Sequence, residues 1–374
     1  MKKDKNTLSA FAALLRAGLW EQSVRLQPFT PVDYSALYAL AEEQSVVGLI
    51  AAGLRHVEDT EVPKPVLKRF FKKVGMLVVR NRMMNYFIGV MEEQLREAGA
   101  CALLLKGQGI AQCYEKPQWR ASGDIDFFLD DVDYEKAKAF LLPLASSSEV
   151  EGVAIKHLGL TIKPWFVELH GTLRCGLSKR IDRELDSIQS RVFSDRQFRV
   201  WQNSNTEVLL PPVNEDIIYV FVHILQHFYR GGIGLRQICD WCRQLWVYRD
   251  SIDASLLQSR IHSMRLDTEW RAFAAYAVEF LGMPADAMPL YEDRRMWHNK
   301  ARRIQSFIMK VGNFGHNRDM SYYSNKPYLV RKLISFFQRL GDLGRHACSF
   351  PLDSFRFFPS IVFNGLRSAA HGEG

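Results

Sequence analysis

The sequence predicts an α+β protein in which a mixed-sheet core is flanked by an N-terminal and a C-terminal helical region. Three observations support this prediction. Residues 1–98 carry apolar side chains at helical spacing, residues 99–205 alternate short apolar runs with helical patterns, and helical patterns return from residue 206 to about residue 345. The 374 residues are 47% hydrophobic and 24% charged, the composition of a globular protein with room for two or three substructures.

The start of the N-terminal region fits two kinds of segment. "MKKDKNTLSAFAALLRAGLW" has the basic end and apolar stretch of a signal peptide, but Arg16 interrupts the stretch and no small-residue cleavage site follows. Apolar residues recur at helical spacing, at Leu8, Phe11, Leu15 and Leu19. We therefore expect an amphipathic helix.

Two further helical segments follow in this region. Thr30 and Pro31 predict the start of a helix, with threonine as the cap and proline at the first helical position, and spaced apolar residues continue to Leu54. Pro65 opens a second pattern, which runs to Gly99 without a strong helix breaker. This pattern predicts one long helix or two helices in line.

The core is predicted from the order of its segments in residues 99–205. Continuous or alternating apolar runs, typical of strands, occur in "ACALLLKG", "DIDFFL", "GVAIKHLGLTI" and "WFVELHGTL". The first two are separated by a short helical pattern, "GIAQCYE", and the second is followed by "DVDYEKAKAFLLPL", a helix behind an aspartate cap. Lys163 and Pro164 separate the last two strands. The order strand, helix, strand, helix, strand, strand predicts a mixed sheet.

A C-terminal helical domain is predicted for residues 206–345, with a basic and aromatic tail at 346–374. Pro211 and Pro212 mark its boundary, and "NEDIIYVFVHILQHFYRGG" predicts a helix capped by asparagine and ended by glycine. From Lys300 onward there are twelve Lys or Arg against four Asp or Glu, an excess that equals the +8 net charge of the whole chain. Such a surface suits an anionic partner or a membrane surface, and a solvated helical face is the alternative.

The six cysteines show no disulfide-framework spacing, which favours a reducing cytoplasm. Cys239 and Cys242 form a CxxC, but no second CxxC accompanies them to complete a zinc site. We interpret them as small hydrophobic residues on a helix face.

The most informative motif is the acid pair Asp124 and Asp126 in "ASGDIDFFLD". In a strand, residues two apart point to the same face, so both carboxylates project together and repel each other unless a cation lies between them. Mg²⁺, or Mn²⁺ as the alternative, is the hard divalent cation that suits such oxygen ligands and substrate phosphates. Glu168, an isolated acid in an apolar strand, is the candidate third carboxylate.

Several residues near these acids are candidates for nucleotide binding. Lys106 and Gly107 end the strand expected beside the acid strand, where glycine lets the backbone approach a phosphate and lysine adds charge. Arg120 lies four residues before Asp124 and could steady a phosphate or pair with an acid. His170 shares a face with Glu168, where it could orient that acid or touch substrate, and a structural histidine is the alternative.

A helix in the C-terminal domain supplies further candidates. His223 and His227 are four residues apart, so one helix face carries both, and we expect this face to line the cleft, with core packing as the alternative. The glutamate of an HExxH zinc motif is absent from this helix. Arg236 and Asp240 have the same spacing and could pair with each other.

At this point the chain resembles a known family. "LLLKG", "RASGDIDFFL", "VELHGTL" and "HILQHFYRGGIGLRQICDW" are similar to NTP_transf_5, a bacterial group of uncharacterised nucleotidyltransferases within the DNA polymerase beta-type superfamily. The similarity extends to about residue 250. It implies that Asp124 and Asp126 are the metal-binding pair, Glu168 the third carboxylate and Gly107 the nucleotide-loop glycine. The superfamily's usual Gly-Ser turn is here Lys-Gly-Gln, so no serine contact to the phosphates is expected.

The resemblance implies a nucleotidyltransferase that moves a nucleoside monophosphate from an NTP to an unidentified acceptor hydroxyl and releases pyrophosphate. A second hypothesis is an inactive protein of the same fold that binds or scaffolds. A third is a nucleic-acid binder that works through the basic tail, although the core has no stacking or groove-reading motif.

Overall fold

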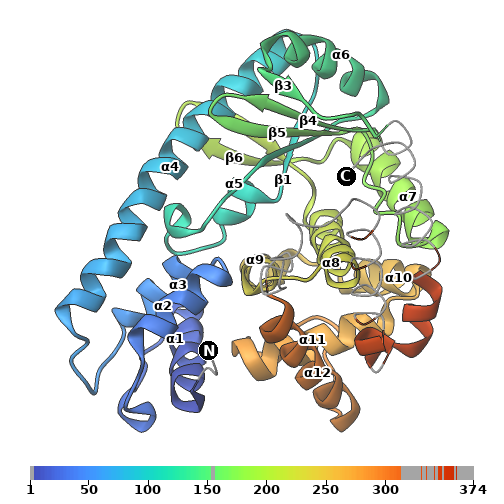
Figure 1. The fold of residues 1–374 in the computed structure, drawn as a ribbon. Coiled ribbons are helices and arrows are strands. Elements are labelled where there is room, and N and C mark those ends of the chain that lie inside the picture. The colour runs from blue at the N-terminus through green and yellow to red at the C-terminus, as the bar shows by residue number, and fades with distance from the viewer. Residues whose placement is uncertain are drawn as a thin grey trace.

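The computed structural model describes residues 4–152 and 156–312, and further positions at 330, 334, 341, 344–347, 349–357 and 359. The predicted α+β class is confirmed, since a five-stranded mixed sheet is flanked by helices that precede and follow it in the chain (Figure 1). Within these described ranges, none of the helices has both the length and the apolar character needed to cross a bilayer.

The N-terminal region contains α1 (Lys5–Trp20), α2 (Tyr34–Glu43) and α3 (Val47–Leu54). The amphipathic first helix is as expected. The predicted helix start at Thr30 and Pro31 is wrong, because Asp33 is the cap and its carboxylate accepts from the amides of Ser35 and Ala36. The apolar pattern that follows is divided between two helices, with Ser45 between them in the left-handed region at φ 57°.

The next pattern forms one helix, α4 (Lys64–Glu97), with 34 residues. It extends from the N-terminal helices to the sheet along one side of the molecule (Figure 1). Its inner face packs against α3 at one end and against the strand β7 (Thr206–Leu210) at the other. This helix therefore fixes the sheet relative to the N-terminal helices.

The sheet has the strand order β1-β2-β5-β4-β3. Its strands are β1 (Leu103–Leu105), β2 (Ile125–Phe128), β3 (Ser147–Ser148), β4 (His157–Ile162) and β5 (Trp165–His170). The pair β2 and β5 is parallel and the other pairs are antiparallel. As predicted, α5 (Gly107–Ala111) separates β1 from β2, and α6 (Asp131–Leu141) follows behind the Asp130 cap.

In chain order, the elements between the five-stranded sheet and the C-terminal helices were not predicted from the sequence. They are α7 (Lys179–Asp195) and a hairpin of β6 (Arg199–Asn203) and β7. The expected return of helices at residue 206 is therefore wrong, because Val208 and Leu210 are strand residues buried with the sheet. The asparagine cap is wrong too: Asn214 lies inside α8 and its side chain bonds the backbone of Asp253.

The C-terminal helices are α8 (Val213–Arg230), α9 (Leu235–Val247), α10 (Ala254–Met264), α11 (Asp267–Leu281) and α12 (Arg295–Val311). Short 3₁₀ turns occur at Gln27–Phe29, Pro117–Trp119, Leu142–Leu144, Arg249–Ser251 and Ala285–Ala287. The two helical regions pack on each other, since Arg16 donates to the carbonyls of Glu279 and Phe280 and Trp20 donates to that of Leu281. They share one large apolar core.

The described part of the predicted tail is helical at 346–347, 349, 351–357 and 359. Its aromatic residues Phe350 and Phe357 are buried and pack against Tyr229 of α8. These two aromatic residues therefore belong to the core, whereas Phe355 is 74% exposed. Positions 348, 358 and 360–374 of the predicted tail lie outside the described residues. Cys239 and Cys242 are free thiols buried on α9, as their interpretation as hydrophobic residues expects.

Candidate functional site

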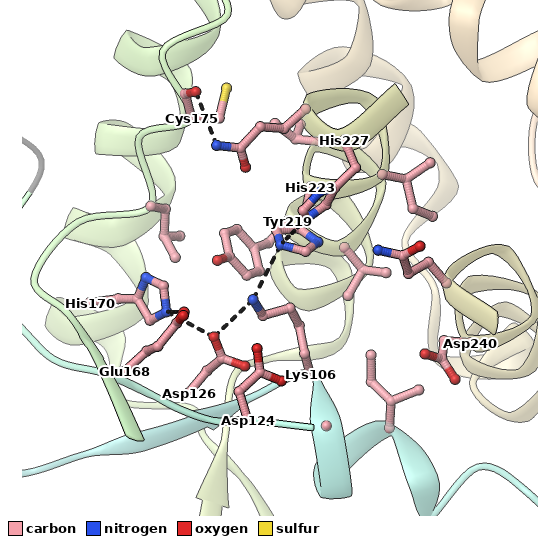
Figure 2. Close-up of a pocket in the computed structure, with 18 of the residues that line it drawn as sticks. Lys106, Asp124, Asp126, Glu168, His170, Cys175, Tyr219, His223, His227 and Asp240 are labelled. Carbon is pink, nitrogen blue, oxygen red and sulfur yellow. Dashed lines mark hydrogen bonds and ion pairs between the residues drawn. The ribbon is translucent and has the colours of Figure 1, made fainter. Parts of the chain in front are cut away.

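A cavity of about 410 Å³ lies between the sheet and the helices α8 and α9 (Figure 2). Its upper wall is formed by the turn after β1, the start of β2 and the end of β5, and α8 forms the opposite wall. This volume suits a small-molecule ligand. All eight site residues predicted from the sequence line it: Lys106, Gly107, Arg120, Asp124, Asp126, Glu168, His170 and His223.

The three predicted acids meet in this cavity. Asp126 on β2 is the direct neighbour of Glu168 on the parallel strand β5, and Asp124 immediately precedes β2. One ligand oxygen from each carboxylate lies within 4.8 Å of the others. Repulsion by Asp126 is the largest cause that raises the pKa of Asp124, as expected for like charges held close.

Lys106 contacts the acids through the turn that ends β1. Its ammonium lies 2.9 Å from Asp126 Oδ1. Lys106 and Gly107 both have positive φ, at 49° and 41°, so the chain turns sharply here and glycine is favoured at the second position. Burial by itself lowers the pKa of Lys106, but attraction by Asp126 and then by other groups including Asp124 outweighs it, and the pKa is raised overall.

Two histidines hold the third carboxylate. His170 Nε2 lies 2.9 Å from Asp126 Oδ1 and 3.3 Å from Glu168 Oε2, and His157 Nε2 lies 3.2 Å from the same Glu168 oxygen. Burial raises the pKa of Glu168, but hydrogen bonds from both histidines and the charges of His170 and Lys106 lower it well below the usual range. Glu168 is therefore a carboxylate at neutral pH. His170 orients this carboxylate, which is one of the two roles predicted for the histidine from the sequence.

The opposite wall contributes uncharged polar groups from α8. A protonated lysine can only donate, so His223 Nε2 accepts from Lys106 Nζ at 3.3 Å. His227 Nε2 lies 3.1 Å from His223 Nε2. Burial, and then Lys106, lowers the pKa of His223 well below its usual value and that of His227 to about 4. Burial raises the pKa of Tyr219 to about 12. The expectation that this face lines the cleft is confirmed.

Arg120 takes the second of the two roles considered for it, pairing with an acid. Its guanidinium forms a bidentate ion pair with Asp240 of α9, at 2.8 and 2.7 Å, and Tyr114 donates to the same carboxylate at 2.7 Å. The Arg120 carbonyl accepts from Asn81 of α4 at 2.7 Å. The loop that leads to the acid pair is thereby tied to two helices.

The expected pairing of Arg236 with Asp240 is wrong. Asp240 accepts from Arg120, whereas Arg236 donates to the carbonyl of Ala121 at 2.8 Å. Arg120 contacts both oxygens of Asp240 in bidentate geometry, which leaves no second bidentate position on this carboxylate for Arg236.

The residues of the acid cluster suit a hard divalent cation. Three carboxylates converge here, and all of their ligand atoms are oxygens. One or two carboxylates are the usual protein contribution to a Mg²⁺ site that also takes substrate phosphates. Asp126 is almost fully buried at 1% exposure, so its charge needs a partner. In the described structure Lys106 supplies part of that compensation.

The cavity also contains residues that the sequence did not single out, namely His157 and Tyr219. His157 is opposite His170 in the β4–β5 hairpin. Counting back from the turn at Lys163 and Pro164 would have found that pairing, because antiparallel partners are equally distant from their turn. No local pattern marks Tyr219, which reaches the cavity because α8 crosses beneath the sheet.

The fold and the acid cluster together define a nucleotidyltransferase-like protein. The family model described as "Uncharacterised nucleotidyltransferase" (NTP_transf_5) matches residues 30–282, and the chain belongs to this family. The match continues through α11, beyond the limit of about residue 250 expected from the sequence motifs. Among curated proteins and among solved structures, no significant match was found.

Proposed function

We propose that the protein is a metal-dependent nucleotidyltransferase of the DNA polymerase beta-type superfamily. It transfers a nucleoside monophosphate from an NTP to an acceptor hydroxyl and releases pyrophosphate. The observation that carries this proposal is the convergence of Asp124, Asp126 and Glu168 beside Lys106 in one ligand-sized cavity. Structural acids without a chemical role are seldom gathered in this way, because their mutual repulsion destabilises the fold.

Asp124, Asp126 and Glu168 would hold Mg²⁺, or Mn²⁺ in its place. Such an ion polarises a phosphoryl oxygen and lowers the pKa of a bound hydroxyl. The two histidines keep Glu168 ionised and fixed in orientation, so this ligand is ready before substrate arrives.

The protein's own cations complement the triphosphate. Lys106 stays protonated at neutral pH because Asp126 attracts it, and its ammonium can donate to a phosphate oxygen while it remains close to that acid. Arg174 and Arg230 also line the cavity. On the α8 wall, Tyr219 and His223 are uncharged at neutral pH and can donate or accept at the base or the acceptor without repelling either.

A transfer assay tests the proposal. The purified protein is incubated with each α-labelled NTP in turn, Mg²⁺ or Mn²⁺, and a cell extract as the source of acceptors. We expect label to move from one or more NTPs to a discrete acceptor with wild type and with Asp131→Asn, an exposed acid of α6, but not with Asp126→Asn. Metal-dependent NTP binding without transfer from any NTP would favour the scaffold hypothesis instead.

A further inference from the structure

A second group of metal-type donors adjoins the three carboxylates. His157 and His170 each offer a ring nitrogen and Glu168 a carboxylate oxygen, and these atoms lie within 4.8 Å of one another. The backbone fixes this grouping. His157 and His170 are cross-strand partners in the β4–β5 hairpin, and Glu168 is two residues before His170 on the same face of the strand.

The separations between these atoms match those of ligands in one coordination shell. Ligand atoms about 2.1 Å from a metal ion are about 3.4 Å apart at tetrahedral angles and about 3.0 Å apart at octahedral angles. His157 Nε2 lies 3.2 Å and His170 Nε2 lies 3.3 Å from the same oxygen, Glu168 Oε2. The two imidazole rings are tilted by 58° and their centroids are 4.8 Å apart, so both can turn toward a common point beside that oxygen.

The location is compatible with added positive charge. Asp126 Oδ1 lies between His170 Nε2 and the Lys106 ammonium, 2.9 Å from each, so this carboxylate charge separates an ion held by the histidines from the ammonium (Figure 2). The three side chains are only partly exposed, at 29% for His157, 19% for Glu168 and 11% for His170. They are shielded from bulk solvent and yet open to the cavity.

The donor chemistry differs from that of the acid cluster. Imidazole nitrogens suit Zn²⁺ and related transition metals, whereas three carboxylates suit Mg²⁺ or Mn²⁺. We infer that His157, Glu168 and His170 form a distinct site for a divalent transition-metal ion of the Zn²⁺ type. Glu168 has two carboxylate oxygens, so it can serve this site and the acid cluster together. The inference concerns binding alone and stands whether or not the proposed transfer reaction occurs.

The test is Zn²⁺ binding to the metal-free full-length protein by equilibrium dialysis, in excess Mg²⁺ to saturate the acid cluster. Co²⁺ replaces Zn²⁺ in a parallel titration, because its visible absorption reports nitrogen ligation and low coordination number. We expect wild type to bind one equivalent of Zn²⁺. One equivalent of Co²⁺ should give visible absorption bands typical of nitrogen ligation at low coordination number. His262→Ala, which alters an exposed histidine of α10, is the matched control and should behave as wild type.

Two variants separate metal ligation from a hydrogen-bonding role of His157. His157→Ala removes both, whereas His157→Gln keeps a donor for Glu168 and removes the imidazole ligand. We expect both to weaken Zn²⁺ binding by about a hundredfold and to abolish the Co²⁺ bands, since loss even of an outer-shell partner costs 10–100-fold. Wild-type affinity in a folded His157→Gln protein, or no Zn²⁺ bound by wild type, would overturn the inference.

The same experiment is informative about the neighbouring acid. Asp124→Asn should retain Zn²⁺ affinity within a few-fold, because Asp124 belongs to the acid cluster and not to the histidine group. Loss of Zn²⁺ binding in this variant would show that the ion lies among the three carboxylates, which also contradicts the inference. Failure of transfer activity with Zn²⁺ binding intact would instead count against the proposed function.

Discussion

The two acids of the pair Asp124 and Asp126 should have opposite effects on stability when each is changed to asparagine in metal-free buffer. Asp126 is buried and forms the ion pair with Lys106, whereas Asp124 is solvent-exposed and lies beside two like charges. Both substitutions remove one carboxylate from the candidate metal site. We therefore expect similar functional losses and opposite changes in the free energy of unfolding.

The magnitude for Asp124→Asn follows from the distances. Two unit charges 4.8 Å apart, the limit within which the acid oxygens lie, interact by about 1 kcal/mol in water and about 3.5 kcal/mol at an effective dielectric of 20. Asp124 is repelled by Asp126 and Glu168 and attracted by Lys106. If the attraction offsets one of the two repulsions, the net effect is that of one repulsive pair. Because Asp124 is exposed, the lower figure applies, and we expect a stabilisation of about 1 kcal/mol.

Asp126→Asn leaves the Lys106 ammonium without its closest partner. The two side chains are 15% and 2% exposed, and breaking a buried ion pair by removing one member costs about 3–5 kcal/mol. Lys106 keeps weaker attractions to Asp124 and Glu168 and lines the cavity. We therefore expect a destabilisation of about 3 kcal/mol, at the low end of that range.

Urea denaturation at pH 7 with EDTA measures both changes, and repetition with Mg²⁺ tests the metal site. At a Mg²⁺ concentration ten times its dissociation constant, wild type should gain about 1.4 kcal/mol, and both variants should gain much less. Destabilisation by Asp124→Asn, or stabilisation by Asp126→Asn, would refute the charge balance described for the site.

Three other substitutions probe buried charges elsewhere. Burial raises the pKa of Glu92 to about 8, so the contribution of Glu92 to stability is greatest below its ordinary pKa of 4.5 and is lost as pH rises toward 8. The free energy of unfolding of Glu92→Gln, measured in urea titrations, should therefore rise by about 3 kcal/mol relative to that of wild type as pH increases from 5 to 8. A difference between the two proteins that stays the same over this pH range would contradict the prediction. Burial lowers the pKa of His227 to about 4, so stability is lost as pH falls from 6.5 toward 4, and His227→Gln should remove about 3 kcal/mol of that dependence. Asp240→Asn leaves the Arg120 guanidinium buried without its carboxylate and should lower the free energy of unfolding by about 3 kcal/mol, measured in urea at pH 7. A change under 1 kcal/mol would mean that this ion pair does not anchor the loop.

The acid cluster could be predicted from the sequence because its geometry is mostly local. Asp124 and Asp126 are two residues apart, and Glu168 lies in a strand whose apolar neighbours fix its direction. The β1 turn at Lys106 was found for the same reason, since an apolar run that ends in Lys-Gly predicts where the strand stops. Strand identity and side-chain alternation were sufficient for these residues.

Contacts set by register or by helix packing could not be predicted in this way. His157 reaches Glu168 through hairpin register, and Asp240 meets Arg120 because α9 packs on a loop 120 residues earlier in the chain. The i, i+4 spacing of Arg236 and Asp240 suggested a local pair, but a distant guanidinium had the better geometry. The hairpin at 199–210 was missed because its strands are short, and β6 is largely polar.

Calorimetric binding of a non-hydrolysable NTP analogue, with and without Mg²⁺, tests the central claim most directly. Saturable binding by wild type should require Mg²⁺ and should weaken by at least about a hundredfold in Asp126→Asn, since charge stabilisation by the ion is worth several kcal/mol. Asp131→Asn should match wild type. Binding that is absent from wild type with every base, or that is equally tight without Mg²⁺ and in Asp126→Asn, would contradict the assignment of these carboxylates to a metal-dependent nucleotide site.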